Sequence, residues 1–239
     1  MKSNILIGIM VLCAGSLLAA AGDPAAEVKS AAAALGNQVN YTWRATVEVP
    51  PDAQFRPGPT DGKTEKGGYT TLSFEFGDNT TEAALKGTNG AIKTDEGWKS
   101  LADAVKDADG GFNPTVFLAR LVQNYKVPAA EAASLVVAAK ELKKDTNGIS
   151  GDLTEAGAKE LLTFRLRGGN DGGPTVANPK GSVKFWLKDG QLAKYQYHVQ
   201  GSVSFNGNDH DVDRTTTVEI KDVGSTKIVI ANEAKKLLP

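Results

Sequence analysis

Segments in which apolar and polar residues alternate constrain the fold of this chain more than any other feature. In the clearest of them, over residues 40–49, every second residue is apolar: Tyr41, Trp43, Ala45, Val47 and Val49. Successive side chains of a β-strand point to opposite faces of a sheet, so this period of two predicts a strand with one buried face. The chain is therefore expected to build at least one antiparallel sheet.

The same period recurs along both ends of the chain. It predicts strands over residues 69–76, 80–86, 91–94, 98–99, 183–187, 192–200, 203–205, 215–221 and 228–230, with a tight hairpin at Asp189-Gly190. Two stretches rich in Gly, Pro and charge, residues 50–67 and 168–181, lack an apolar period. We expect both of these stretches to be loops.

Helical patterns fill the middle of the sequence and also open it. They predict helices over residues 23–35, 101–108, 114–125, 128–143 and 154–164, several beginning with Pro at the first helical position. Lys140, Lys143 and Lys144 would then complement the dipole at the end of the fourth helix. Strands that follow one another, with helices segregated between them, indicate an α+β fold, and the absence of a βαβ unit excludes a dinucleotide-binding sheet.

The N-terminus has the three parts of a secretory signal. Lys2 precedes an uncharged run over residues 5–18, and Ala19-Ala20-Ala21 provides a small-residue cleavage site, which predicts removal of residues 1–21. Retention as a membrane anchor is the alternative, although the run is slightly short for a spanning helix. Leu12 before Cys13 argues against lipidation, because lipoprotein signals carry a small residue there. We expect a periplasmic or secreted protein without a membrane span after cleavage.

Composition limits the chemistry that the exported chain could perform. Lys and Arg number 27 against 28 Asp and Glu, so no basic surplus predicts a nucleic-acid partner. The only Cys and both Met residues lie within residues 1–21, which leaves no thiol in the mature chain. A sulfur-free chain suits an oxidising compartment and cannot form disulfides.

Candidate catalytic residues are few. His198 falls on the polar face of its predicted strand, and the set Asp209, His210, Asp211 and Asp213 could converge on a divalent ion. A polar hairpin explains this set as well, so a metal-assisted hydrolase is the least favoured of three hypotheses. No nucleophile elbow, zinc motif or phosphate loop occurs. We expect no enzyme activity, no cofactor and no metal.

The order of elements resembles the LolA/LppX-like lipoprotein-carrier superfamily. The resemblance rests on the signal, the first helix, the Tyr41-x-Trp43 strand, the Gly97-Trp98 turn, the hairpin over residues 185–194 and the run over residues 216–228. It implies a strongly curved antiparallel β half-barrel covered on its concave face by helices, and several members shelter acyl chains between these layers. It also implies one domain over residues 22–239, with a helical insertion near 101–164.

A curved sheet with one apolar face can leave a cavity beneath sparse helices. The residues expected to bind a lipid or other apolar ligand there are Trp43, Leu72, Phe74, Phe76, Phe117, Leu121, Phe185, Tyr195 and Tyr197. A filled core explains the same residues. In that case the chain would be an envelope interaction module, which binds a protein partner through a sheet edge or through the stretches 50–67 and 168–181.

Overall fold

A single antiparallel sheet of eleven strands organises the molecule in the computed structural model, which describes residues 22–53, 56–77, 79–106, 113–163, 174–205 and 208–238. The predicted signal, residues 1–21, lies outside these residues. The strands are β1 (Asn40–Glu48), β2 (Thr60–Glu65), β3 (Tyr69–Phe76), β4 (Asn79–Lys86), β5 (Asn89–Thr94), β6 (Gly97–Ser100), β7 (Lys143–Asp145), β8 (Gly148–Asp152), β9 (Thr175–Lys188), β10 (Gln191–Phe205) and β11 (Asn208–Lys221).

The spatial order of the strands is β6-β5-β4-β3-β2-β1-β11-β10-β9-β8-β7. Each half is a meander of consecutive strands, and the two halves join where β1 pairs with β11. At this seam Trp43 lies opposite Ile220 and Ala45 opposite Val218. Hydrophobic alternation sets this register, because a shift of one residue would turn every apolar side chain outward.

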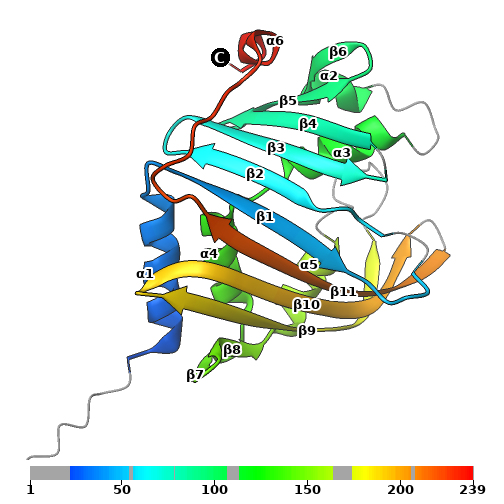
Figure 1. Cartoon of the computed structure of the whole chain (residues 1–239). Coiled ribbons are helices and arrows are strands. Elements are labelled where there is room, and N and C mark those ends of the chain that lie inside the picture. Colours follow the sequence, from blue (N-terminus) through cyan, green and yellow to red (C-terminus); the bar gives the residue numbers. More distant parts are fainter. Residues whose placement is uncertain are drawn as a thin grey trace, which may run out of the picture.

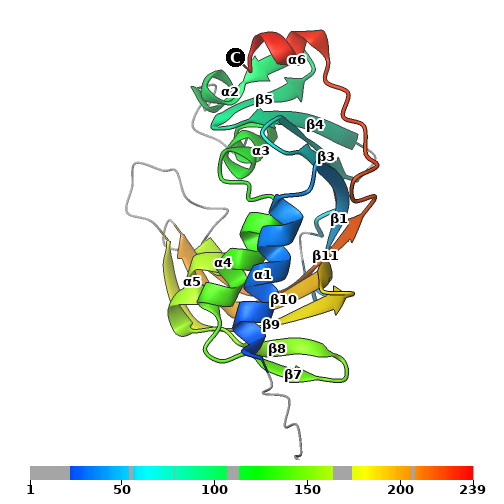
Figure 2. The same cartoon turned by 90° about the vertical axis from the view of Figure 1, so that its left-hand side faces the viewer.

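Helices cover the concave face of the curved sheet (Figures 1 and 2). They are α1 (Pro24–Gly36), α2 (Leu101–Lys106), α3 (Pro114–Gln123), α4 (Pro128–Ala138) and α5 (Glu155–Thr163). The short α6 (Asn232–Lys236), near the C-terminus, packs on the other face of the sheet. Asp23 caps α1 by accepting a hydrogen bond from the Ala25 amide at 3.0 Å, and Pro24 follows at the first helical position. The predicted α+β half-barrel with helices on its concave face is confirmed.

The main core fills the space between the sheet and the helices. Its largest fully buried side chains include Trp43, Tyr195, Phe185, Leu72 and Leu135. Among the described residues, no helix is long and apolar enough to cross a membrane.

The last described residues cross the outer, convex face of the sheet. The segment 222–231, which we call the strap, begins with a turn at residues 223–225 and belongs to no strand, so the strand predicted over residues 228–230 is wrong. The strap leads to α6 over the β4–β6 end of the sheet (Figure 1). Ile230 of the strap, together with Ala234 and Leu238, packs against Ala84 and Ala91 in a second apolar cluster.

Strand β2 lies inside the stretch 50–67, so the loop predicted there is wrong for residues 60–65. Its inner face carries Thr60, Gly62 and Thr64 rather than large apolar residues. The Trp43 ring occupies the space over Gly62, where a Cβ atom would come within 2.1 Å of that ring. The neighbouring strand thus supplies the apolar cover that the sequence of β2 lacks.

The predicted helix over residues 128–143 ends early. Ala139 is already extended and bridges Leu153, and Lys143–Asp145 forms β7. The basic residues therefore do not cap a helix, and Lys144 instead pairs with Glu27 of α1, with a nitrogen–oxygen distance of 2.7 Å. The short hairpin β7–β8 forms because Gly148, at φ +134°, makes the turn and Ile149 is buried.

The loop predicted over residues 168–181 is wrong from Thr175 onward, where β9 has already begun. Residues 168–173 lie outside the described residues. The strand requires glycine at position 181, because a Cβ atom there would come within 2.4 Å of the His198 carbonyl oxygen. The composition of these polar, glycine-containing segments predicts loops, whereas pairing with the strands on either side makes β2 and β9 strands.

Candidate ligand pocket

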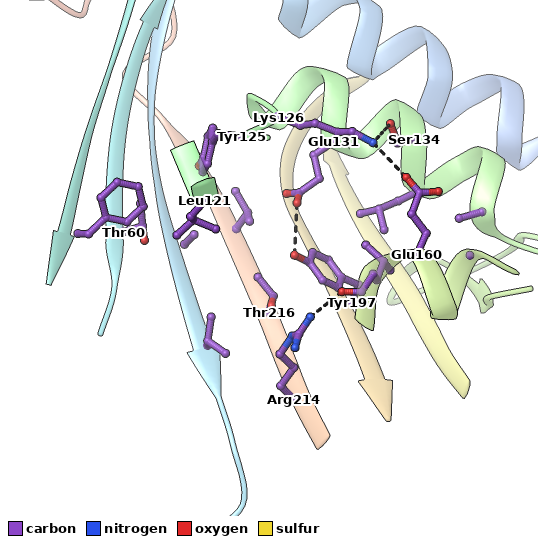
Figure 3. A pocket seen from close by; sticks show the side chains of 18 residues that line it. Thr60, Leu121, Tyr125, Lys126, Glu131, Ser134, Glu160, Tyr197, Arg214 and Thr216 are labelled. Atoms are coloured by element: carbon purple, nitrogen blue, oxygen red, sulfur yellow. Dashed lines mark hydrogen bonds and ion pairs between the residues drawn. The ribbon is translucent and has the colours of Figure 1, made fainter. Parts of the chain in front are cut away.

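A pocket of about 100 Å³ lies between the concave face of the sheet and helices α3–α5 (Figure 3). Strands β1, β2, β3, β10 and β11 form one wall, and α3, α4, α5 and the segment after α3 form the other. The space admits several water molecules or part of an alkyl chain. The interior therefore stays open here, between the sheet and helices α3–α5.

Apolar side chains make up most of the pocket wall. They are Ala45, Val47, Phe74, Leu121, Leu135, Ala138, Leu161 and Val218. They come from strands of both meanders and from all three helices, so the fold assembles this wall from segments distant in sequence. These side chains favour contact with hydrocarbon over contact with water because they carry no hydrogen-bonding group.

Glu131 connects the helix layer to the sheet at one side of the pocket. It lies in the first turn of α4, and its carboxylate accepts hydrogen bonds from the Tyr195 hydroxyl at 2.5 Å and the Tyr197 hydroxyl at 3.3 Å. Tyr195 and Tyr197 are two residues apart on β10 and so point to the same face. A carboxylate that is largely removed from water is stabilised by such donors.

Tyr125 and Tyr195, which lie near Glu131, remain protonated. Burial raises the pKa of Tyr195 well above its usual range, and the negative charge and hydrogen bond of Glu131 raise it further. Burial and the same carboxylate also raise the pKa of Tyr125, whose hydroxyl accepts a hydrogen bond from the Trp43 indole at 2.9 Å. These hydroxyls act as hydrogen-bonding groups and not as bases at physiological pH.

Charged side chains surround the solvent side of the pocket. The Lys126 ammonium lies 3.6 Å from a Glu160 carboxylate oxygen and 3.3 Å from the Ser134 hydroxyl, and both charged side chains are partly exposed. Arg214 of β11 donates to the Leu161 carbonyl oxygen at 2.7 Å. The opening thus carries two cations and one anion, with Glu131 deeper inside.

Three of the nine predicted ligand residues line the pocket: Phe74, Leu121 and Tyr197. Trp43, Leu72, Phe185 and Tyr195 are instead buried in the main core, and Phe117 is partly buried against it. The side chain of Phe76 lies outside the described residues. The role of all nine in ligand binding stays a prediction.

The polar residues of the pocket were not predicted from the sequence; they include Tyr125, Glu131, Arg214 and Thr216. Arg214 and Thr216 had a detectable signal, because they alternate in phase with Val212 and Val218 and so lie on the concave face of β11. A polar residue on the apolar face of a strand indicates a special environment. Glu131 had no such signal, since an acidic residue in the first turn of a helix is ordinary.

The acidic set near the β10–β11 turn lies on a different part of the sheet. Asp209, Asp211 and Asp213 alternate with His210 along β11 and therefore point away from its face. Asp213 contacts the His198 ring at 2.8 Å. Among the described residues, no group of three potential ligands comes together to hold a metal ion.

Comparisons with known proteins give matches among solved structures alone. No family model matches the sequence, and no curated protein matches it. The structure is similar to that of the lipoprotein LppX from Mycobacterium tuberculosis, at 10% identity and a TM-score of 0.44 over 86% of this chain and 97% of that chain. LprF from Mycobacterium bovis is similar at 11% identity and a TM-score of 0.44, over 88% and 97% of the two chains.

A LolA superfamily protein from Nitrosomonas europaea is also similar, at 7% identity and a TM-score of 0.35 over 87% of this chain and 95% of that chain. The likeness concerns architecture alone.

Proposed function

We propose that this chain is an exported cell-envelope protein that binds the alkyl part of a lipid or another apolar ligand in the pocket, without catalysing a reaction. The observation that carries the proposal is the open apolar space between the sheet and helices α3–α5. Contiguous apolar surface that water can reach favours a ligand that replaces that water. Residues 1–21 would direct export and be removed.

Several features support binding rather than catalysis. The hydroxyls of Tyr125 and Tyr195 are held protonated by burial, and Lys126 is paired with Glu160, so these groups serve structure and charge balance. Where the Ser134 hydroxyl lies next to Lys126, the ammonium donates to that hydroxyl and is also paired with Glu160. A periplasmic or secreted location agrees with the sulfur-free mature chain.

The interior also supports a second candidate. Five of the predicted ligand residues are buried in one continuous core: Trp43, Leu72, Phe74, Phe185 and Tyr195. An envelope protein-interaction module with a filled interior would have the same core. The two candidates differ in whether an alkyl chain occupies the pocket.

Native mass spectrometry of the protein purified from an envelope fraction, followed by solvent extraction, tests the proposal. We expect a bound species with a long alkyl chain, released on extraction. Ala45→Leu narrows the pocket from β1 and should lower the bound fraction at least tenfold. Thr46→Leu is the matched control, because Thr46 is exposed on the opposite face of the same strand. A protein that is always empty, with equal spectra for both variants, would favour the interaction module.

A further inference from the structure

One buried hydroxyl in the pocket has no hydrogen-bond partner among the described residues. Thr216 of β11 is only 5% exposed and lines the pocket, and its Oγ1 atom makes no hydrogen bond to the part of the chain that the structure describes. Buried polar groups are almost always paired, since an unpaired one loses its contacts with water without replacement. Thr216 therefore identifies a point inside the apolar wall where a polar atom of a ligand would be stabilised.

The charges around this hydroxyl are already balanced. The described pocket lining contains two cations, Lys126 and Arg214, and two anions, Glu131 and Glu160. Lys126 lies next to Glu160, Arg214 donates to a backbone carbonyl, and Glu131 accepts two tyrosine hydroxyls. A charged headgroup would bring a net charge into this set and would have to be desolvated as well.

Thr216 and Arg214 lie side by side on β11, two residues apart on the same face (Figure 3). Phe74, Leu121 and Val218 belong to the apolar wall of the same pocket. A ligand that places an oxygen atom at Thr216 can thus keep its hydrocarbon part against that wall. The geometry matches a molecule with a polar atom at one end and an alkyl chain behind it.

Resting on the proposed function, we propose that the pocket selects amphiphiles with an uncharged oxygen-bearing head, an alcohol or an ester, through a hydrogen bond to Thr216. The Thr216 hydroxyl donates to the ligand oxygen, which accepts, and the alkyl chain lies along the apolar wall. A free fatty acid would add a net negative charge to a set of two cations and two anions that is already balanced, and should bind more weakly. A long-chain amine would bring a third cation close to Lys126 and Arg214 and should bind more weakly as well.

Binding of five probes with the same ten-carbon chain tests this selection: decanol, methyl decanoate, decane, decanoate and decylamine. Displacement of a fluorescent alkyl probe from the full mature chain at neutral pH gives the relative affinities. We expect decanol and methyl decanoate to bind about fivefold to tenfold more tightly than decane, the gain of one net hydrogen bond. Decanoate and decylamine should bind more weakly than decanol.

Three variants separate the hydroxyl from its surroundings. Thr216→Val is nearly isosteric and should erase the preference for decanol over decane while leaving the affinity for decane unchanged. Thr216→Ser retains the hydroxyl and should keep the preference. Thr215→Val, on the opposite face of β11, is the matched control and should behave as the unmodified protein. Thr216→Val should also unfold at the same or a higher urea concentration, because it removes a group without a partner.

Two results would overturn the selection while leaving the proposed function intact. One is equal affinity for decanol and decane, and the other is a preference for decanol that survives in Thr216→Val. Tightest binding of decanoate would likewise contradict the charge balance on which the selection depends. Failure of every probe to bind, decane included, would overturn the proposed function together with the selection.

Discussion

The Trp43 indole donates a hydrogen bond to the Tyr125 hydroxyl at 2.9 Å, and the two rings stack with centroids 6.3 Å apart. This pair joins β1, at the seam of the sheet, to the segment that connects α3 with α4. Tyr125 also lines the pocket. The contact therefore holds the helix layer at a defined distance above the sheet on one side of the cavity.

We expect Tyr125→Phe to lower the free energy of unfolding by about 1–3 kcal/mol, since the Trp43 indole N–H would remain buried without an acceptor. Urea denaturation followed by Trp fluorescence measures the change. Tyr69→Phe removes a hydroxyl on the outer face of the sheet and serves as the control. Equal unfolding midpoints for the two variants would show that the hydrogen bond does not stabilise the layers.

The close contact between β2 and Trp43 gives a second prediction. Gly62→Ala would place a Cβ atom 2.1 Å from the Trp43 ring, so one of two central strands must shift. We expect a loss of at least about 1–3 kcal/mol in the free energy of unfolding, as for overpacked cores. Gly36→Ala is the control, because its Cβ atom would meet Ala129 at an ordinary 3.4 Å. A stable Gly62→Ala variant would contradict the tight packing over β2.

Alkaline pH should destabilise the protein through its buried tyrosines. Burial raises the pKa of Tyr41 from 10.0 to about 12, so the folded state retains a proton that the unfolded state releases. The unfolded state then binds fewer protons between pH 10 and 12, and the free energy of unfolding falls as the pH rises through this range. Below pH 10 the contribution of Tyr41 is fully present. Tyr125 and Tyr195 act in the same direction.

Urea titrations at several pH values between 9 and 12 would measure this fall, which for Tyr41 alone amounts to about 2–3 kcal/mol. Tyr41→Phe should show a smaller dependence on pH over the same range. The Tyr69→Phe variant provides the comparison. A free energy of unfolding that stays constant up to pH 12 would contradict the raised pKa of Tyr41.

Two adjacent residues of the strap, Val229 and Ile230, lie in opposite environments. Ile230 is buried in the second apolar cluster, whereas Val229 is 87% exposed. We expect Ile230→Ala to cost about 2 kcal/mol or more and Val229→Ala to stay within about 0.5 kcal/mol of the unmodified protein. Hydrogen exchange of the amides in α6 would report the same difference locally. Equal effects would mean that the strap does not stabilise the outer face.

Much of the sheet could be predicted from the sequence because alternation is a direct consequence of strand geometry. The strands β1 and β3 carry large apolar residues on one face and were recognisable. Strand β2 was not, because the apolar cover over Gly62 comes from Trp43 of another strand. The alternation of Ile228 and Ile230 with Val229 predicts a strand in the strap. These isoleucines instead pack against side chains on the outer face of the sheet and pair with no neighbouring strand.

The pocket could be predicted only in part. Phe74, Leu121 and Tyr197 belong to recognisable apolar stripes, and the order of elements places those stripes between sheet and helices. The polar groups depend on contacts that no local pattern encodes: Glu131 meets Tyr195 across 64 residues of chain. The end of α4 at Ala138, which frees Leu142 for the core, is likewise decided by tertiary packing and not by helix propensity.

The seam between β1 and β11 also determines when the chain can finish folding. Across this seam the Thr42 hydroxyl donates to the Asp222 carboxylate over a separation of 180 residues. A chain that emerges from its N-terminus can pair β1 through β6 early, but one edge of β1 stays unpaired until nearly the last residues arrive. Contacts this distant in sequence slow folding. The order of synthesis thus leaves the sheet open down its middle for as long as the chain is incomplete.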